Sequence, residues 1–322
     1  MHEHPSKAHA PAAAFLASGP CVGRHDPPAP FHPNAETRRD NHFHTAAPMN
    51  AATVAKAADD KVTRVADALQ ATGVQVHLFE DAGAETPDSV FPNNWFSTHS
   101  GGHVAVYPMY STNRRAERRG DAVEMLKSQY RVQDIIDYSG LEQDGLFLEG
   151  TGAMVIDHLE RVAYAARSKR ASEILLERFC PHFNYEPVVF DAVDATGQPI
   201  YHTNVVMCIG TGFAMIGLDC IPDTARRHEV AERLRRGESD IIALGHAQIA
   251  EFAGNAIELQ GRDGLVLALS SRALRSLDGV QRATLERHAT LLPLDIPTIE
   301  HAGGSVRCMI AGLHLSARPL NS

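Results

Sequence analysis

The sequence predicts an α/β protein in which about five copies of one unit, strand, strand, helix and strand, close into a ring. Three observations predict it: a turn followed by two short apolar segments recurs along the chain, helical stretches lie between these hairpins, and another apolar segment follows each helix. Successive copies begin roughly 50 to 55 residues apart, as in propeller and array repeats. Because one such unit cannot bury its apolar face alone, we expect the copies to stack around a common axis.

The hairpins open each unit. Each begins with small or polar residues and continues with two segments rich in Val, Ile, Leu and Ala, which a short polar or glycine-containing turn separates. This pattern is typical of β-hairpins. The five copies begin near Asn93, Glu149, His202, Gly254 and Gly303. A doubly wound arrangement in two domains would not explain this period.

Helices and third strands complete the units. Amphipathic spacing predicts helices over residues 61–72, 114–129 and 222–237. The second of these carries Arg114 and three more arginines in its first turns, where positive charge opposes the helix dipole. We therefore expect at least one of these arginines to have another task. The strands expected after the helices are residues 74–79, 131–137, 187–190, 241–244 and 290–294.

Composition excludes several classes of protein. The chain has 322 residues and a formal net charge of −9, which argues against a nucleic-acid partner. Its apolar runs fall well short of the roughly 20 residues that a membrane span needs. Residues 1–29 are rich in His, Pro and Ala and lack the basic start of a secretion signal. We expect a disordered extension over 1–29, a single catalytic domain over 30–322 and a cytoplasmic protein.

The five cysteines indicate reduced thiols. They are odd in number and form no C-x-x-C pair, so neither a disulfide framework nor a zinc site is predicted. His2, His4 and His9 in the extension are expected to bind metal only incidentally. We expect no metal and no cofactor, and the sequence leaves the oligomeric state open, a homo-oligomer included.

The turns that open the units carry the residues with the most chemistry. A thiol, an imidazole and a carboxylate from three different units could meet at the axis as nucleophile, acid/base and orienting group. Each alone is more often a structural residue, but all occur at the same phase of the repeat. The turn residues are Asp88, Asn93, Asn94, Glu149, His202, Asn204, Asn255 and Cys308.

Four ordered motifs carry a resemblance to a known superfamily. The chain resembles the guanidino-modifying enzymes, which comprise arginine deiminases, dimethylarginine dimethylaminohydrolases and amidinotransferases, and most closely their arginine-deiminase-related citrulline ureidase (CtlX-like) branch. The resemblance covers roughly residues 30–322 and implies a five-bladed α/β propeller of ββαβ units, the pentein fold. The motifs are residues 87–99 (PDSVFPNNWFSTH), Leu148-Glu149-Gly150-Thr151-Gly152, Tyr201-His202-Thr203-Asn204 and the glycine-rich run into Cys308-Met309.

The resemblance also implies roles for these residues. Cys308 would attack the central carbon of a guanidino or ureido group, His202 would act as general acid and then as base for water, and Glu149 would hydrogen-bond the substrate nitrogens. Arg114 and Arg167 fall where arginine deiminases hold the substrate α-carboxylate, which suits guanidinium forks. The expected partner is therefore a small arginine-like or citrulline-like amino acid, bound also by Asp88, Asn93, Asn94 and Asn204.

Two departures from the deiminase pattern concern the substrate. Asn94 and Asn204 stand where deiminases have aspartates. Carboxylates suit a cationic guanidinium, whereas an amide offers both a donor and an acceptor to a neutral ureido group. We therefore expect hydrolysis of the terminal C–N bond of citrulline, which gives ornithine, ammonia and carbon dioxide.

Another departure concerns the start of the chain. Relatives open with a hydrophobic strand, whereas residues 19–28 here are too rich in Pro and Gly for a central strand. We expect the strand that closes the ring to be missing, degraded or differently built.

Other functions remain open at this stage. An amidinotransferase or an arginine deiminase would share the covalent intermediate, with an amine replacing water in the first case. A non-catalytic binder of arginine-like metabolites belongs to a different class, and joint retention of Cys308, His202 and Glu149 disfavours it. A cysteine protease is less favoured, because no motif places a residue to orient His202 toward a peptide.

Overall fold

The computed structural model describes residues 10–11, 13–20, 34, 36–37, 41–45, 51–81 and 86–319. These residues form five three-stranded sheets. In each sheet the middle strand pairs antiparallel with one neighbour and parallel with the other. The predicted α/β propeller of ββαβ units is therefore confirmed.

The strands follow one order in every unit. The five sheets are β15 (Ala311–Leu313), β1 (Ala13–Pro20) and β2 (Gln75–Asp81); β3 (Phe96–His99), β4 (His103–Val106) and β5 (Asp134–Asp137); β6 (Met154–Asp157), β7 (Val162–Ala166) and β8 (Glu186–Phe190); β9 (Met207–Gly210), β10 (Phe213–Ile216) and β11 (Asp240–Ala243); and β12 (Ile257–Gln260), β13 (Leu265–Ser270) and β14 (Thr290–Leu294). The first-named strand of each sheet is called its inner strand below. Inner strands contact one another around the centre: β15 contacts β3, β6 contacts β9, and β9 contacts β12.

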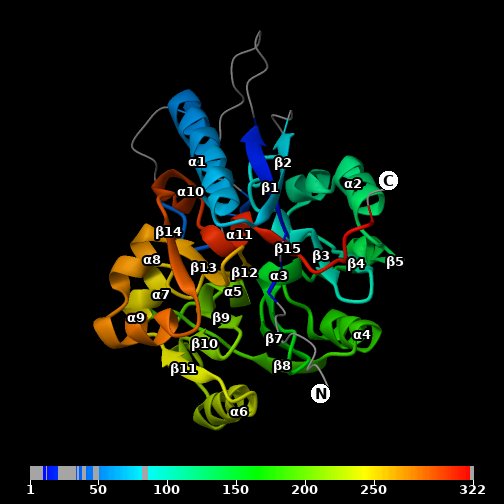
Figure 1. Ribbon diagram of the computed structural model, residues 1–322. Helices are drawn as coiled ribbons and strands as arrows, with labels where there is room; N and C mark the ends of the chain where they lie inside the picture. Colours follow the sequence, from blue (N-terminus) through cyan, green and yellow to red (C-terminus); the bar gives the residue numbers. More distant parts are fainter. Residues whose placement is uncertain are drawn as a thin grey trace, which may run out of the picture.

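Helices connect each middle strand to its parallel neighbour and lie on the outside of the ring (Figure 1). Such a crossover is what a parallel pair of strands requires. These helices are α1 (Ala51–Ala71), α2 (Gly120–Gln129), α4 (Glu173–Phe183), α6 (Thr224–Arg235), α8 (Ser271–Ser276) and α9 (Gly279–Glu286). Smaller helices are α7 (His246–Ala250) and α10 (Pro297–Glu300), and single 3₁₀ turns are η4 (Ser139–Asp144) and η5 (Leu218–Cys220). Within the described ranges, no helix has the length and apolar character needed to cross a membrane.

The predicted helix over residues 114–129 is divided in the structure. A 3₁₀ turn, η3 (Thr112–Glu117), precedes α2, which begins only at Gly120 and has Asp121 in its first turn. The arginines therefore lie ahead of the α-helix rather than against its positive end, which removes the unfavourable placement that the sequence suggested. Arg114 has another task, as described below.

The expectation of a missing or degraded first strand is wrong. Strand β1 is the middle strand of the sheet that closes the ring, with Phe15 opposite Ala311 of β15 and His77 of β2. It begins upstream of the Pro/Gly-rich segment 19–28 and includes only the first two residues of that segment, and it lies inside the segment 1–29 that the sequence assigned to a disordered extension. That assignment is therefore wrong for β1, and residues 1–9 and 21–29 lie outside the described residues.

Phe15 supplies much of the packing of β1. Its ring is fully buried, stacks on Phe79 with centroids 4.7 Å apart, and meets the edge of Phe96 at 5.1 Å. We expect Phe15→Ala to lower the free energy of unfolding by about 3–5 kcal/mol, as measured by urea denaturation. Leu78→Ala on the adjacent strand is the matched control, because Leu78 is 41% exposed. A loss at Phe15 no larger than that at Leu78 would mean that β1 does not close the ring.

Candidate active site

Short helical turns precede four of the five inner strands and lie near the centre of the ring (Figure 1). Asn93, Asn94, Asn204 and Cys308 lie in these turns and are buried. Glu149 and His202 are the residues that immediately precede α3 and α5. The turns are η2 (Pro92–Asn94) before β3, α3 (Gly150–Ala153) before β6, α5 (Thr203–Val206) before β9 and α11 (Val306–Met309) before β15.

Two glycines of α3 let these turns approach one another. Gly150 has φ +45°, and a Cβ there would lie 2.4 Å from the backbone oxygen of Asn93. A Cβ on Gly152 would meet the amide of Asn94 at 2.2 Å and the ring of His202 at 2.9 Å. Any larger residue would therefore separate the turns, so this glycine pair is part of how the sequence brings η2, α3 and α5 together.

The sulfur of Cys308 is held by two side-chain amides. Asn204 Nδ2 and Asn255 Nδ2 each lie 3.3 Å from Sγ. Asn255 is itself fixed, because Nδ2 also donates to the backbone oxygen of Asn204 at 2.9 Å and Oδ1 accepts from the backbone N–H of Arg307 at 3.1 Å. N–H donors aimed at sulfur stabilise the negative charge of a thiolate, the nucleophilic form.

This contact predicts an effect on thiol reactivity. In Asn255→Ala, Sγ loses one of its two amide donors, and a hydrogen bond to a charged group is worth about 1.5–3 kcal/mol. We expect Cys308 to react with iodoacetamide about 10- to 100-fold more slowly at fixed pH, measured by mass spectrometry of the labelled peptide. Asn184→Ala, at the end of α4, is the control. An unchanged labelling rate in Asn255→Ala would contradict this role.

His202 and Glu149 form a buried pair. His202 Nε2 lies 2.9 Å from Glu149 Oε2, and Glu149 Oε1 accepts from the backbone N–H of Tyr110 at 3.0 Å. Burial alone would raise the pKa of Glu149, but Arg170, His202 and Arg114 outweigh it and hold that pKa well below its usual range. Burial lowers the pKa of His202, against the opposing effect of Glu149. Near neutral pH the pair is therefore a carboxylate and a neutral imidazole that can accept a proton.

Cys308 and His202 line one cavity of about 270 Å³. Asp88, Asn94, Arg114 and Arg170 also line it. The structure thus brings the predicted nucleophile and acid/base together beside Glu149, which lies within hydrogen-bond reach of His202. Groups from four different units meet there, as the repeat phase suggested.

Arg114 reaches this cavity, but its guanidinium already has carboxylate partners. Nε and Nη2 bind the two oxygens of Glu117 at 2.9 and 2.8 Å, and Asp88 lies 3.7 Å from Nε. When its amide oxygen faces Arg114, Asn94 accepts from Nη1 at 2.8 Å and donates to Asn93 Oδ1 at 3.0 Å. This network fixes Asn94 and Asp88. The sequence analysis missed Glu117, for which the only signal was its spacing of three residues from Arg114.

The assignment of Arg167 to the site is wrong. Its side chain is 46% exposed and pairs with Glu173 and Asp191 on the surface. Arg170, three residues later in the same loop, lines the cavity instead, with Nη1 3.4 Å from Glu149 Oε2 and its guanidinium 5.1 Å from the centre of the Tyr201 ring. Sequence alone could not separate two arginines in one loop, because the turn between them decides which one points inward.

Several buried polar atoms around the cavity have no hydrogen-bond partner among the described residues. They include Asp88 Oδ1, Asn93 Nδ2 and Asn204 Oδ1. The other oxygen of Asp88 accepts from Asn34 at 2.9 Å and from Thr37 at 3.2 Å, so this carboxylate is firmly positioned. Buried polar groups normally have partners. Of these three residues only Asp88 lines the cavity, where its second oxygen can accept a hydrogen bond from a bound molecule.

Comparisons with solved structures find the same fold. The N-terminal domain of ArgZ, an arginine dihydrolase from the ornithine-ammonia cycle in Cyanobacteria, solved as a cysteine-to-serine mutant with substrate, has a TM-score of 0.67 at 16% identity, over 92% of this chain and 96% of that domain. A complex of AgrE with L-arginine has a TM-score of 0.68 at 15% identity, over 92% of this chain and 39% of AgrE. A dimethylarginine dimethylaminohydrolase adduct has a TM-score of 0.59 at 10% identity, over 92% of this chain and 98% of that protein. The chain spans about 40% of full-length ArgZ.

Sequence comparison identifies the family. No protein with curated annotation matches the chain significantly. The family model described as N,N dimethylarginine dimethylhydrolase, eukaryotic, matches residues 27–315. This match covers most of the chain, including every turn that contributes to the cavity. The chain therefore belongs to the N,N dimethylarginine dimethylhydrolase family, within the superfamily of guanidino-modifying enzymes of the pentein fold.

Proposed function

We propose that this protein is a cysteine-dependent hydrolase of the terminal C–N bond of an arginine-like amino acid, and that it converts citrulline into ornithine, ammonia and carbon dioxide. The observation that carries the proposal is the shared cavity of Cys308 and His202, with Glu149 bound to the imidazole and two amides bound to the sulfur. A nucleophile, a base and a group that orients the base are the parts that covalent catalysis needs.

The first half of the reaction forms a covalent intermediate. His202 takes the thiol proton, and Cys308 Sγ adds to the ureido carbon. The C–N bond to the terminal nitrogen then breaks, and the imidazolium gives its proton to that nitrogen. Ammonia departs, and Cys308 remains as an S-carbamoyl cysteine that carries the rest of the substrate. Glu149 keeps the imidazole oriented and stabilises its positive charge, because the carboxylate remains ionised.

The second half regenerates the thiol. His202 removes a proton from one water molecule, whose oxygen adds to the carbonyl carbon and breaks the C–S bond. The product is an N-carboxylated ornithine, which loses carbon dioxide to give ornithine. The overall reaction therefore consumes one water molecule for each citrulline. Dividing the substitution into two steps lowers the barrier of each step.

The amides around the cavity favour a ureido substrate. Asn94 and Asn204 are neutral side chains where a site for a cation would have carboxylates, and a ureido group is likewise neutral. Asn204 Oδ1 and Asp88 Oδ1 are acceptors without partners among the described residues, and they suit the ureido N–H groups. These amides support assignment of the chain to the citrulline ureidase branch. We also propose that the reaction takes place in the cytoplasm, where the four described cysteines, all free thiols, would stay reduced.

Arginine is the second candidate substrate. Around the cavity, three carboxyl groups (Asp88, Glu117 and Glu149) face two guanidinium groups (Arg114 and Arg170). Burial raises the pKa of Glu117 to about 7, so near neutral pH the carboxyl groups carry only a small excess of negative charge, which suits a bound cation. The structural relatives crystallised with L-arginine and with ornithine support an arginine-like ligand. Two successive hydrolyses of arginine would pass through the same ureido chemistry and end at ornithine, and an amine in place of water would make the enzyme an amidinotransferase.

Product analysis tests the proposal. The purified protein is incubated separately with citrulline, arginine and dimethylarginine, and with arginine plus glycine, and ornithine, citrulline and ammonia are measured by mass spectrometry and a coupled assay. We expect ornithine and ammonia in equal amounts from citrulline. Rapid conversion of arginine into citrulline with citrulline itself untouched would overturn the ureido assignment. Transfer of the amidino group to glycine would identify an amidinotransferase.

A further inference from the structure

A second, larger cavity lies at the other end of the inner strands. It has a volume of about 840 Å³, and all five inner strands line it, from β3 round to β15. The catalytic turns precede these strands, whereas this cavity is also lined by residues that directly follow them, such as His158 after β6 and His314 after β15. Helix α11 contributes to both cavities, because Arg307 lines the second and the next residue, Cys308, lines the first.

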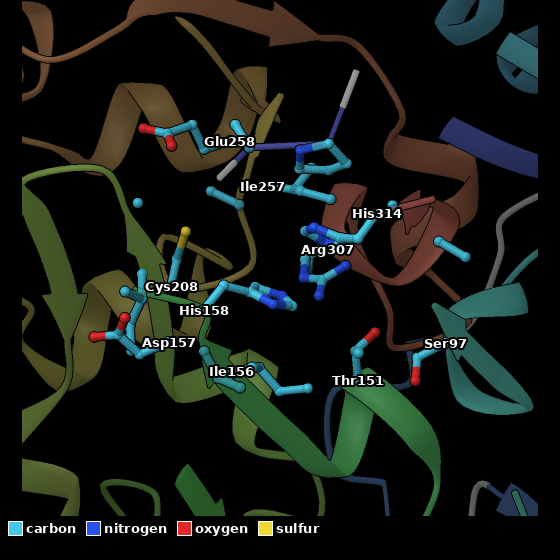
Figure 2. A pocket seen from close by; sticks show the side chains of 18 of the residues that line it. Ser97, Thr151, Ile156, Asp157, His158, Cys208, Ile257, Glu258, Arg307 and His314 are labelled. Carbon is cyan, nitrogen blue, oxygen red and sulfur yellow. The ribbon is translucent and has the colours of Figure 1, made fainter. Parts of the chain in front are cut away.

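A guanidinium and two imidazoles meet inside this cavity. Figure 2 shows Arg307, His158 and His314 pointing toward one another at its centre. The rings of His158 and His314 stack with centroids 4.0 Å apart. The guanidinium of Arg307 donates from Nη1 to the backbone oxygen of Ile310 at 3.1 Å, and no carboxylate of the described residues forms an ion pair with it. Arg307 is partly buried, and a cation removed from water normally has an anionic partner.

The two carboxylates on the cavity wall do not provide that partner. Asp157 accepts hydrogen bonds from the backbone of the β6–β7 turn at Leu159 and Glu160, at 3.0 and 2.9 Å. Glu258 accepts from the backbone and the hydroxyl of Thr211 at 2.9 and 2.7 Å. Figure 2 shows both carboxylates on the side of the cavity away from Arg307.

The electrostatics of the cluster agree with this geometry. Burial lowers the pKa of His158, and repulsion from His314, His99, Arg161 and Arg307 lowers it further. Burial also lowers the pKa of Arg307. Burial thus disfavours the Arg307 cation and keeps His158 neutral near pH 7, and a bound anion would supply the ionic partner that Arg307 does not have among the described residues.

We propose that this second cavity is a binding site for a small organic anion, whose carboxylate or phosphate oxygens bind the Arg307 guanidinium beside the stacked rings of His158 and His314. The planar guanidinium fork matches such oxygens in pairs. Ile156 and Ile257 also line the cavity and provide apolar surface for the rest of the ligand (Figure 2).

The site is coupled to the catalytic sulfur through one residue. The backbone N–H of Arg307 donates to Asn255 Oδ1 at 3.1 Å, and Asn255 Nδ2 lies 3.3 Å from Cys308 Sγ. An anion that shifts Arg307 therefore shifts a group that holds the nucleophile. This effect on turnover rests on the proposed function, whereas binding of the anion does not.

Calorimetry and crystallography with two probes test the site. Inorganic phosphate and 4-bromobenzoate are titrated into the full-length protein, and crystals soaked in 4-bromobenzoate are examined for the anomalous signal of bromine. We expect one probe to bind once per chain, with Arg307→Gln weakening binding about tenfold or more, and Arg307→Lys recovering part of it. Arg235→Gln makes the same change of charge at an exposed pair with Glu232 on α6 and should leave binding unchanged.

The outcomes separate cleanly. If phosphate binds more tightly than bromobenzoate, the natural ligand carries a phosphate group. If bromobenzoate binds more tightly, the ligand carries a carboxylate. Either result supports the site. If the wild-type protein binds neither probe, if bromine lies only in the catalytic cavity, or if Arg235→Gln weakens binding as much as Arg307→Gln, the site does not exist. Should Arg307→Gln fail to fold, the bromine position and the Arg307→Lys titration decide. Because these readouts measure binding, they stand even if no ornithine is formed from citrulline.

Discussion

Replacing Cys308 by serine should reduce ornithine formation from citrulline by at least about 10³-fold while the protein stays folded. The exchange keeps the side chain nearly the same size, so the buried turn α11 and its contacts with Asn204 and Asn255 are retained. A serine hydroxyl does not ionise near neutral pH, however, and only an anionic nucleophile adds readily to a resonance-stabilised ureido carbon. Turnover is measured as ornithine released, and folding by thermal denaturation.

A matched exchange separates the chemistry from a general effect of losing a thiol. Cys220→Ser also changes a buried thiol, but Cys220 lies in η5 and contacts His246, away from both cavities. We expect it to keep near wild-type turnover. Turnover in Cys308→Ser comparable to that of Cys220→Ser would remove Cys308 from the reaction and require a different nucleophile.

The sequence was sufficient to predict which residues meet because the repeat has a fixed phase. Glu149, His202 and Cys308 each lie in the turn that opens a unit, and the ring places equivalent turns side by side. The prediction needed no contact information, only that copies of one unit stack around an axis. The hairpins and the third strands could be predicted for the same reason, because their apolar segments recur with the period of the repeat.

The sequence was insufficient where tertiary contacts decide local structure. Strand β1 is rich in alanine, which has little preference for strands, and only its burial between β15 and β2 makes it one. Arg114 belongs to the catalytic cavity but is held by Glu117 and Asp88, so its role there is to fix other groups. Side-chain direction in a loop, as for Arg167 and Arg170, is set by packing rather than by spacing along the chain.

Glu149→Gln should damage both turnover and stability. The carboxylate lies 2.9 Å from His202, 3.4 Å from Arg170 and 3.8 Å from Arg114, and it is fully buried. An amide of the same shape cannot balance the two guanidinium charges, and breaking a buried ion pair costs about 3–5 kcal/mol. The imidazole also loses the charge that stabilises its protonated form, so kcat should fall about 10²- to 10⁴-fold. Urea unfolding and ornithine release at saturating citrulline measure the two effects.

The pH dependence of the stability loss identifies its electrostatic origin. Burial opposes ionisation of Glu149, but Arg170, His202 and Arg114 prevail and hold its pKa in the folded protein well below the value of about 4.3 in an unfolded chain. The carboxylate therefore contributes its full stabilisation above about pH 4.3, and this contribution is lost as the pH falls toward the folded-state pKa. The difference in unfolding free energy between wild type and Glu149→Gln should be largest at neutral pH and shrink in acid. Glu251→Gln, whose partner Arg272 is on the surface, should cost no more than about 1 kcal/mol. If the loss at Glu149 stays the same down to strongly acidic pH, it comes from packing, and the proposed charge on Glu149 is absent.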